Sequence, residues 1–162
     1  MSKIDSFRNK YYFLSNFYEV PVKYDGIIYQ NNEAAFQAAK VLTIEERMQF
    51  ANLNPSEAKK LGRKVTLRKD WEDIKMQVMK DIVMAKFTQN EDLYEKLLAT
   101  GDTYLEEGNT WGDKIWGTVY GQGANHLGRI LMEVREELRN RSHIIDVGIL
   151  PQTTYNGQEL EL

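Results

Sequence analysis

The chain has 162 residues, enough for one domain with a core, and it has no cysteine, which excludes disulfides and a cysteine nucleophile. Its 42% hydrophobic and 28% charged residues are typical of a water-soluble globular protein, and no run of about 18 apolar residues predicts a membrane span. The net charge of −3 gives no reason to expect tight, sequence-independent binding to nucleic acid.

The N-terminal segment MSKIDSFRNK has neither the apolar core nor the small-residue cleavage site of a secretory signal. We therefore expect the chain to remain in the cytoplasm. The histidines, His126 and His143, show no HExxH or facial-triad spacing, so no metal site is expected. Any catalysis would then depend on carboxylates, lysine, arginine, tyrosine and amides.

The first half of the chain predicts a small antiparallel sheet followed by helices. Short strands are expected over residues 11–22 and 24–29, around Asp25-Gly26, a dipeptide typical of tight hairpin turns. Residues 34–51 favour a long helix with an asparagine N-cap before it, and Thr43 marks the place where this helix could be interrupted. The next segment, Asn54-Pro55-Ser56-Glu57, carries a strong helix-start signal and predicts a short basic helix that ends at Gly62.

The second half predicts further helices around an irregular segment. Residues 91–100 read as a helix, and residues 106–123 as a glycine-rich segment of the kind that carries function. Residues 70–87 predict the central helix, because an apolar stripe runs along them: Ile74, Val78, Met79, Ile82 and Val83.

The last long helix is expected to begin at Asn125, which is suited to cap it. From residue 143 the chain has strand-like and then polar acidic sequence, so residues 143–162 are expected to form an accessory strand or a tail. The buried face of the last helix is predicted from its apolar residues: Leu127, Ile130, Leu131, Val134 and Leu138.

Glu33 and Lys40 are expected on one face of a helix, because a separation of seven positions at roughly 100° per residue returns them to the same side. Phe36 and Gln37 lie between them, so this face carries an acid, an aromatic ring, an amide and an amine. In isolation the pattern is more typical of an ordinary amphipathic surface with both charges solvated. Spacing alone therefore predicts no chemistry.

Two segments offer places for a phosphate. The helix start near Asn125 has free amides and a favourable dipole, although Gly121-Gln122-Gly123 before it does not indicate a dinucleotide fold, since no convincing strand precedes it. Residues 59–69 form a basic cluster, for which composition alone favours a solvated helix face and turn. The cluster consists of Lys59, Lys60, Arg63, Lys64, Arg68 and Lys69.

Tryptophans mark two further segments. Trp71 stands at a helix start. Its ring either packs as a hydrophobic staple that holds the chain where it enters the helix, or stacks on a ligand. The stretch NTWGDKIWGTVYGQG sets Trp111 and Trp116 among glycines, which let backbone approach a ligand closely, while Asp113 offers an acceptor for sugar hydroxyls. We interpret this stretch as a site for ring stacking and sugar recognition. The alternative is a tryptophan-filled turn that closes the core.

Taken together, these segments resemble the NADAR family, also known from the YbiA-type N-glycosidases of the riboflavin pathway. The last matching motif is highly specific, and the matches cover most of the chain in order. Many relatives carry a histidine directly after the glutamate at position 33, where this chain has Ala34, so any role of that imidazole is absent or supplied elsewhere. The motifs are FLSNFY, YQNNEAAFQAAK, PSEAKKLGRKV, LRKDWEDIKMQVM and NTWGDKIWGTVYGQGANHLGRILMEVR.

The resemblance implies one α+β, predominantly helical domain, which we assign to residues 1–142. It also implies cleavage of an N-glycosidic bond to ribose in ADP-ribose-like or ribosylaminopyrimidine compounds, without a metal or redox cofactor. The implied catalytic residues are Glu33, Lys40 and Asp113. Of the predicted substrate-binding residues, the resemblance itself implies Asn16, Trp71 and Trp116. The full predicted set is Asn16, Phe17, Arg63, Arg68, Trp71, Trp111, Gly112, Trp116 and Asn125.

Two mechanisms and three functions stay open at this point. Breaking a ribosyl C–N bond builds positive charge at C1′, so the Glu33 carboxylate would stabilise it and orient water. Alternatively, Lys40 as a free amine would attack the opened sugar and form an imine. The chain is expected to act on a ribosylated small metabolite. The alternatives are an ADP-ribosyl hydrolase acting on modified DNA or protein, and a non-catalytic module that binds ADP-ribose or a nucleotide.

Overall fold

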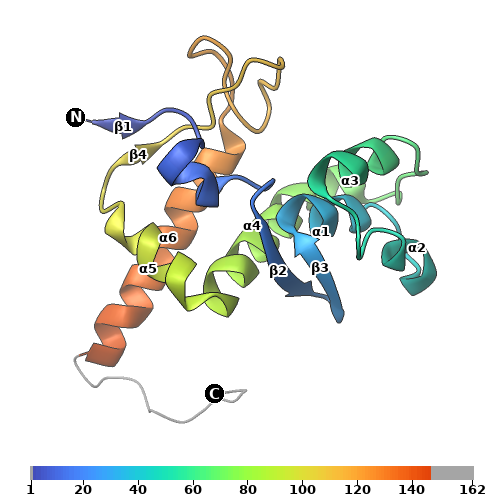
Figure 1. The fold of residues 1–162 in the computed structure, drawn as a ribbon, viewed down its shortest axis with the longest axis horizontal. Coiled ribbons are helices and arrows are strands. Elements are labelled where there is room, and N and C mark those ends of the chain that lie inside the picture. The colour runs from blue at the N-terminus through green and yellow to red at the C-terminus, as the bar shows by residue number, and fades with distance from the viewer. Residues whose placement is uncertain (1, 147–162) are drawn as a thin grey trace.

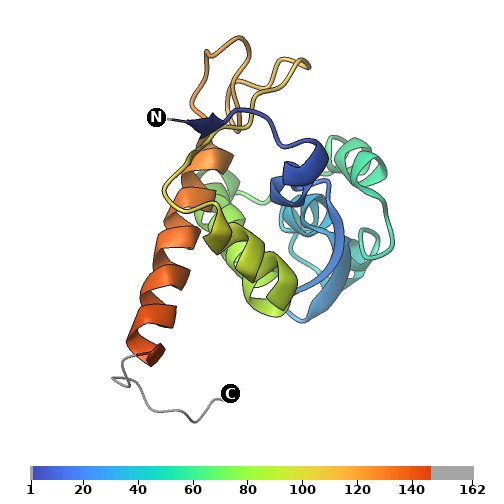
Figure 2. The ribbon, with the colours of Figure 1, turned by 60° about the vertical axis from the view of Figure 1, so that its left-hand side comes forward.

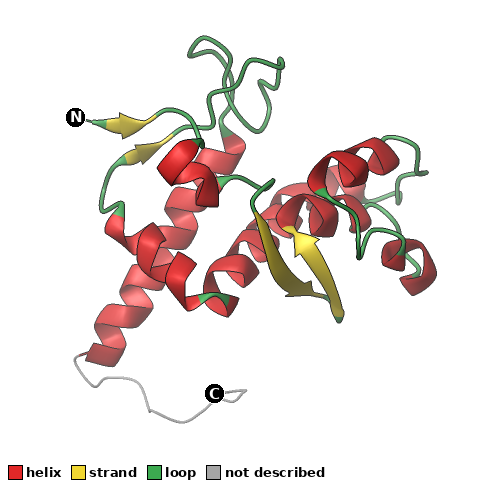
Figure 3. Cartoon of the chain, in the orientation of Figure 1, coloured by secondary structure: helices red, strands yellow, loops and turns green. Residues whose placement is uncertain are grey.

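The computed structural model describes the backbone of residues 2–146 and the side chains of residues 2–142. Helices dominate this part of the chain, and the strands form two small pairs (Figure 3), which confirms the predicted α+β, predominantly helical fold class. The elements are β1 (Lys3–Ile4), the 3-10 helix η1 (Asn9–Leu14), β2 (Glu19–Tyr24), β3 (Ile27–Asn31), α1 (Asn32–Ala38), α2 (Ile44–Met48), α3 (Pro55–Gly62), α4 (Trp71–Gln89), α5 (Glu91–Ala99), β4 (Tyr104–Leu105) and α6 (His126–Asp146).

The predicted hairpin is formed by β2 and β3, which pair antiparallel. Asp25 and Gly26 make its turn with φ values of 52° and 88°, the left-handed conformation that this dipeptide favours. The first part of the strand predicted over residues 11–22 is wrong, because residues up to Leu14 form η1 instead. The neighbouring Phe13 and Leu14 are both buried, which the alternating faces of a half-exposed strand would not allow.

The helix predicted over residues 34–51 is interrupted, with α1 ending at Ala38 and α2 beginning after Thr43. Asn31 caps α1 by accepting a hydrogen bond from the Ala34 N–H at 2.7 Å, and Thr43 caps α2 in the same way. Every residue of α1 is buried, because this short helix lies in the interior against α3 and α4. A helix buried on all sides places any polar group it carries in a largely dry environment.

Helix α4 is the centre of the molecule, since it contacts β2, α1, α5 and α6 (Figure 1). The stripe predicted for it is confirmed in Val78, Met79, Ile82 and Val83, which are buried. The capping box predicted at the start of α3 is also present: the Asn54 side chain accepts from the Glu57 N–H, and the Glu57 carboxylate accepts from the Asn54 N–H.

A parallel pair of short strands, β1 and β4, joins the N-terminal end of the chain to the segment after α5. Nothing in the local sequence predicted this pairing. It leads directly into residues 106–125, a loop that projects beyond the first turn of α6 (Figure 2). Glu106 anchors the start of this loop, because its carboxylate accepts hydrogen bonds from Lys3 at 3.0 Å and from the Thr118 hydroxyl at 2.6 Å.

Helix α6 packs against α4, α5 and β4, and the five apolar residues predicted for its inner face are buried. It continues to Asp146, past the boundary predicted at residue 142. The remainder of the predicted segment 143–162 lies outside the described residues. None of the helices described is both long and apolar enough to cross a membrane.

Candidate active site

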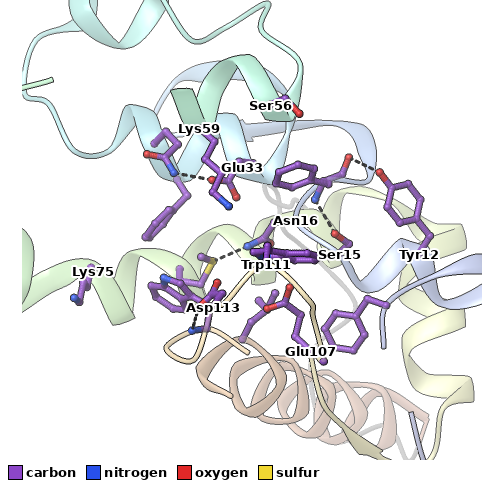
Figure 4. A pocket seen from close by; sticks show the side chains of 18 of the residues that line it. Tyr12, Ser15, Asn16, Glu33, Ser56, Lys59, Lys75, Glu107, Trp111 and Asp113 are labelled. Carbon is purple, nitrogen blue, oxygen red and sulfur yellow. Dashed lines mark hydrogen bonds between the residues drawn. The ribbon is translucent and has the colours of Figure 1, made fainter. Parts of the chain in front are cut away.

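A pocket of about 740 Å³ lies between α1, α3, the start of α4, the segment around η1 and the loop of residues 106–125 (Figure 4). It contains most of the residues that the sequence singled out, although these come from distant parts of the chain. The predicted residues that line it are Asn16, Phe17, Glu33, Lys40, Arg63, Trp71, Trp111, Asp113 and Trp116.

Glu33 presents a buried carboxylate to this pocket from the first turn of α1. Its N–H donates to the Asn16 carbonyl at 3.0 Å, and its Oε2 accepts a hydrogen bond from Gln37 Nε2 at 2.6 Å. Burial raises the pKa of Glu33, while the Gln37 amide and the charges of Lys59 and Lys40 act in the opposite direction. The carboxylate is therefore desolvated yet supported by a donor and two nearby cations.

Gly62 at the end of α3 permits this arrangement. A Cβ at this position would lie 1.9 Å from Gln37 Oε1, so only glycine lets α3 approach the Gln37 side chain this closely. Gln37 is thereby confined on the side that faces α3, with its amide directed to Glu33. The sequence marked Gly62 only as a helix stop.

Lys40 lines the same pocket from the turn that follows α1. The backbone N–H of Lys40 donates to the Gln37 carbonyl at 3.2 Å, which holds the residue against the end of the helix. Burial lowers the pKa of the Lys40 amine, and Glu33 partly offsets this effect. A lysine whose pKa is lowered spends more time as the neutral amine, the form that acts as a nucleophile or a base.

Aromatic rings form part of the pocket lining. Phe36 lies between two indoles, with its ring centroid 5.1 Å from that of Trp71 and 5.3 Å from that of Trp116. Trp71 is only 5% exposed, so its ring packs in the core, and it also lines the pocket. Trp111 also lines the pocket but is different, because 58% of its surface is exposed to solvent. It is free to meet a flat group that enters from solvent.

The loop wall is shaped by side chains that bind backbone. Asn109 Oδ1 accepts from the N–H groups of Trp111 and Asp113, and its Nδ2 donates to the Asp113 carbonyl at 2.8 Å. Asp113 Oδ1 in turn accepts from the N–H groups of Ile115 and Trp116 at 3.0 and 2.9 Å. These bonds fix the turn that carries both tryptophans, so Asp113 acts as a structural clamp as well as a pocket residue.

Comparison with known proteins identifies the family to which this chain belongs. The family model described as NADAR domain matches residues 4–139. The chain belongs to the NADAR family. The NMR structure of YbiA from Escherichia coli aligns with a TM-score of 0.77 and 37% sequence identity, covering 88% of this chain and 89% of that one.

Two curated relatives illustrate the names of similar proteins. The N-glycosidase YbiA of Escherichia coli (strain K12) is 41% identical over 128 residues, which cover 76% of this chain and 79% of that protein. A riboflavin biosynthesis protein of Vibrio vulnificus (strain YJ016) is 40% identical over 149 residues, or 86% of this chain. This chain spans only 40% of the Vibrio protein's length.

Three of the predicted substrate-binding residues do not line the pocket of this NADAR protein. Arg68 instead pairs with Asp70, with Nε to Oδ1 at 2.7 Å. Gly112 has a φ of 90°, a left-handed backbone conformation that favours glycine, within the turn of the loop. Asn125 is 2% exposed and turned inward, where its side chain donates to the Leu105 carbonyl and accepts from the Glu107 N–H.

Positive charge gathers on the α3 side of the NADAR pocket. Lys59 and Arg63, both predicted from the basic cluster, line it, and Lys59 Nζ lies 5.9 Å from the centre of the Phe17 ring. Arg8 and Lys75 add cations that the sequence did not single out. These groups are suited to an anionic ligand. Among the described residues, no cluster of histidine, aspartate and glutamate is arranged to hold a metal ion.

Glu107 is the acidic pocket residue that sequence reasoning missed. Its Oε1 is buried without a hydrogen-bond partner among the described residues, and burial raises the pKa of Glu107 to about 8. The nearby Asp113 and Glu33 act in the same direction. The only sequence signal was a pair of adjacent acids, Glu106 and Glu107, before the glycine-rich stretch. The chain there gives no indication of which acid faces the pocket.

Proposed function

We propose that this protein is an N-glycosidase that hydrolyses the C–N bond between ribose and a base or amine in a ribosylated small metabolite. The observation that carries the proposal is the buried Glu33 carboxylate, which shares one indole-lined pocket with Lys40. The names of the relatives, an N-glycosidase and a riboflavin biosynthesis protein, support the same class of reaction. An ADP-ribose-like compound or a ribosylaminopyrimidine phosphate is the substrate class we expect.

Glu33 stabilises the positive charge that develops at C1′ and the ring oxygen as the C–N bond breaks. In a desolvated pocket a fixed carboxylate acts on that charge far more strongly than it would in water. The same carboxylate orients the attacking water and accepts its proton. The Gln37 amide holds Glu33 in place for both tasks.

The remaining pocket residues bind the parts of the substrate that do not react. Trp111 and Trp116 stack on the base or the ribose. The Asp113 carboxylate accepts hydrogen bonds from the sugar hydroxyls, and the Asn16 amide donates to them or accepts from them. Lys59 and Arg63 bind phosphate.

Lys40 is the alternative nucleophile, and its half-buried amine with a lowered pKa favours this second mechanism. The amine would attack C1′ of the opened sugar, release the base and leave an imine that water later hydrolyses. Sodium borohydride added during turnover would then reduce the imine and raise the protein mass by one sugar adduct on Lys40. An unchanged mass under turnover would eliminate the imine route and leave water activation by Glu33.

Chromatographic detection of the freed base or amine, with ADP-ribose and with ribosylated amines as substrates, tests the proposed activity directly. The wild-type protein should release the base or amine, and Glu33→Gln should release far less while still binding the same compound. Isothermal titration on the same samples provides the binding measurement. Binding with no release by the wild type would overturn the enzyme assignment in favour of a non-catalytic module. Release from ADP-ribosylated DNA or protein but from no small compound would instead favour a macromolecular substrate.

A further inference from the structure

The backbone of Glu107 is held from both sides at the centre of the loop wall. Its N–H donates to Asn125 Oδ1 at 2.9 Å, and its carbonyl accepts from the Thr118 N–H at 2.9 Å. Gly117 lies against its side chain, since a Cβ there would be 2.5 Å from Glu107 Oε1. These contacts orient the carboxyl group, and Glu107 lines the pocket on the side opposite Glu33 (Figure 4).

The three pocket carboxyl groups differ in what their oxygens contact. Asp113 accepts two backbone N–H bonds, and Glu33 accepts one amide bond and lies near two lysines. Glu107 Oε1 is buried with no donor among the described residues. A buried carboxyl without a donor favours the protonated form, whereas bonds from N–H groups favour the ionised form. Burial raises the pKa of Glu33 as well, but Gln37, Lys59 and Lys40 favour its ionised form, whereas Glu107 Oε1 has no donor among the described residues. Of these two carboxyl groups, Glu107 is therefore the better placed to hold the proton.

We propose that Glu107 is the general acid of this reaction and gives its carboxyl proton to the leaving nitrogen as the ribosyl C–N bond breaks. This inference rests on the proposed function. Two carboxyl groups on opposite sides of a glycosidic bond, one protonated and one ionised, form the general arrangement for hydrolysis with water as the nucleophile. Glu33 supplies the ionised partner.

The step balances without any further reactant. The electron pair of the C1′–N bond goes to nitrogen, which takes the Glu107 proton and leaves as a neutral amine or base. Water forms the new C1′–O bond and gives its proton to the Glu33 carboxylate. Proton return from Glu33 to Glu107 through solvent restores both groups.

The charges that face Glu107 come from several elements. Glu33 on α1 and Asp113 in the loop raise its pKa, and Lys59 on α3 lowers it. Arg8, before η1, lines the same pocket. With the pKa of Glu107 raised to about 8, the acid stays protonated at neutral pH and ionises in mildly alkaline solution.

Two probes that differ in their need for a proton test this role. Nicotinamide mononucleotide releases a neutral pyridine without protonation, whereas N-(5-phosphoribosyl)aniline must be protonated at nitrogen. Glu107→Gln should lower kcat/KM for the aniline probe by about a hundredfold or more and for the nicotinamide probe by less than about threefold. Released base is measured chromatographically, with an enzyme-free blank for spontaneous hydrolysis. Equal loss on both probes, or no loss on either, would overturn the role of Glu107.

The wild-type protein gives a second readout that needs no variant. Its kcat/KM for the aniline probe should fall as pH rises through about 8, and the same decline should be missing for the nicotinamide probe. A parallel decline for both probes contradicts the proposal. If the wild type releases base from neither probe, the proposed function itself fails and the inference fails with it.

Glu106→Gln is the matched control, because Glu106 is the adjacent acid but does not line the pocket. Its carboxylate instead bonds Lys3 and Thr118, so this variant disturbs the base of the same loop. It should melt at a lower temperature while keeping the wild-type ratio of rates on the two probes. If it changes that ratio as strongly as Glu107→Gln does, the effect comes from loop distortion and the acid role is wrong.

Discussion

The pocket has one wall of regular helix and one wall of loop, and the two hold their carboxyl groups by different means. On the helix wall, α1 is capped by Asn31 and buried at every position, so packing against α3 and α4 fixes Glu33. On the loop wall, three side chains fix the backbone through hydrogen bonds: Asn109, Asp113 and Asn125.

This difference separates the chemistry of the site from its stability. A change at Glu33 alters one charge inside a wall that many apolar contacts maintain. A change at Asn125 removes bonds that the loop cannot replace, since buried backbone groups left without partners are costly. A substitution of Glu33 on the helix wall should therefore change mainly the catalytic rate, whereas a substitution of Asn125 on the loop wall should change mainly the free energy of unfolding.

The largest effect is expected on the helix wall. Glu33→Gln keeps the shape of the side chain and removes its charge, so kcat should fall by about a hundredfold or more while substrate still binds. Steady-state kinetics and titration measure the two quantities. Glu45→Gln, at an exposed position on α2, should keep the wild-type rate. Full activity in Glu33→Gln would remove Glu33 from the mechanism.

A smaller effect, mainly on stability, is expected on the loop wall. Asn125→Gly preserves the positive φ of 53° but leaves the Leu105 carbonyl and the Glu107 N–H without their partner. The free energy of unfolding should fall by roughly 2 kcal/mol, since an unsatisfied buried group costs about 1–3 kcal/mol. Urea unfolding measures it.

Asn125→Asp separates the two bonds that this residue makes. It keeps the acceptor for the Glu107 N–H but turns a buried carboxylate oxygen toward the Leu105 carbonyl, so at neutral pH it should be at least as destabilised as Asn125→Gly. Unchanged stability in Asn125→Gly would show that the loop wall does not depend on this side chain.

Lys86 supports the segment around Ser15, because its Nζ donates to the Ser15 carbonyl at 2.9 Å. The carbonyl of the next residue, Asn16, accepts from the Glu33 N–H and so connects this segment to the helix wall. Burial lowers the pKa of Lys86 from 10.5 to about 7, so between these pH values the unfolded chain binds more protons than the folded one. The free energy of unfolding should therefore rise with pH in this window, by up to about 1.4 kcal/mol per pH unit. Lys86→Met should lack this contribution when both proteins are unfolded in urea at pH 7 and pH 9. Identical pH slopes would contradict a neutral Lys86.

The smallest effect is expected at Trp111, the exposed ring that lines the pocket. Trp111→Ala removes an exposed ring, so stability should stay within about 0.5 kcal/mol of the wild type. KM should rise by about fivefold, since base stacking on an aromatic ring contributes about 1–3 kcal/mol. Tyr120→Ala is the control, because Tyr120 is 97% exposed on the same loop and does not line the pocket. A KM unchanged by Trp111→Ala would exclude this indole from substrate binding.

The helix wall was the more predictable of the two. Spacing placed Glu33 and Lys40 on one side, and both line the pocket, although α1 ends before Lys40. The loop wall was less predictable, because its shape depends on contacts between residues far apart in the chain. Asn125 was expected to cap a helix and meet a phosphate, but its side chain is taken up by Leu105 and Glu107.

The amino-acid sequence by itself determined the local structure: the Asp25-Gly26 turn, the Asn54 capping box and the apolar faces of α4 and α6. Its motifs also indicated the NADAR family. These features depend on neighbouring residues and on helix or strand periodicity, which are visible in one dimension. Only the tertiary structure decided which carboxyl groups lie in the pocket and which of them lack a donor. Desolvation and hydrogen bonding depend on what packs around a group in space, and for Glu107 those neighbours come from α1, α3 and both ends of a loop.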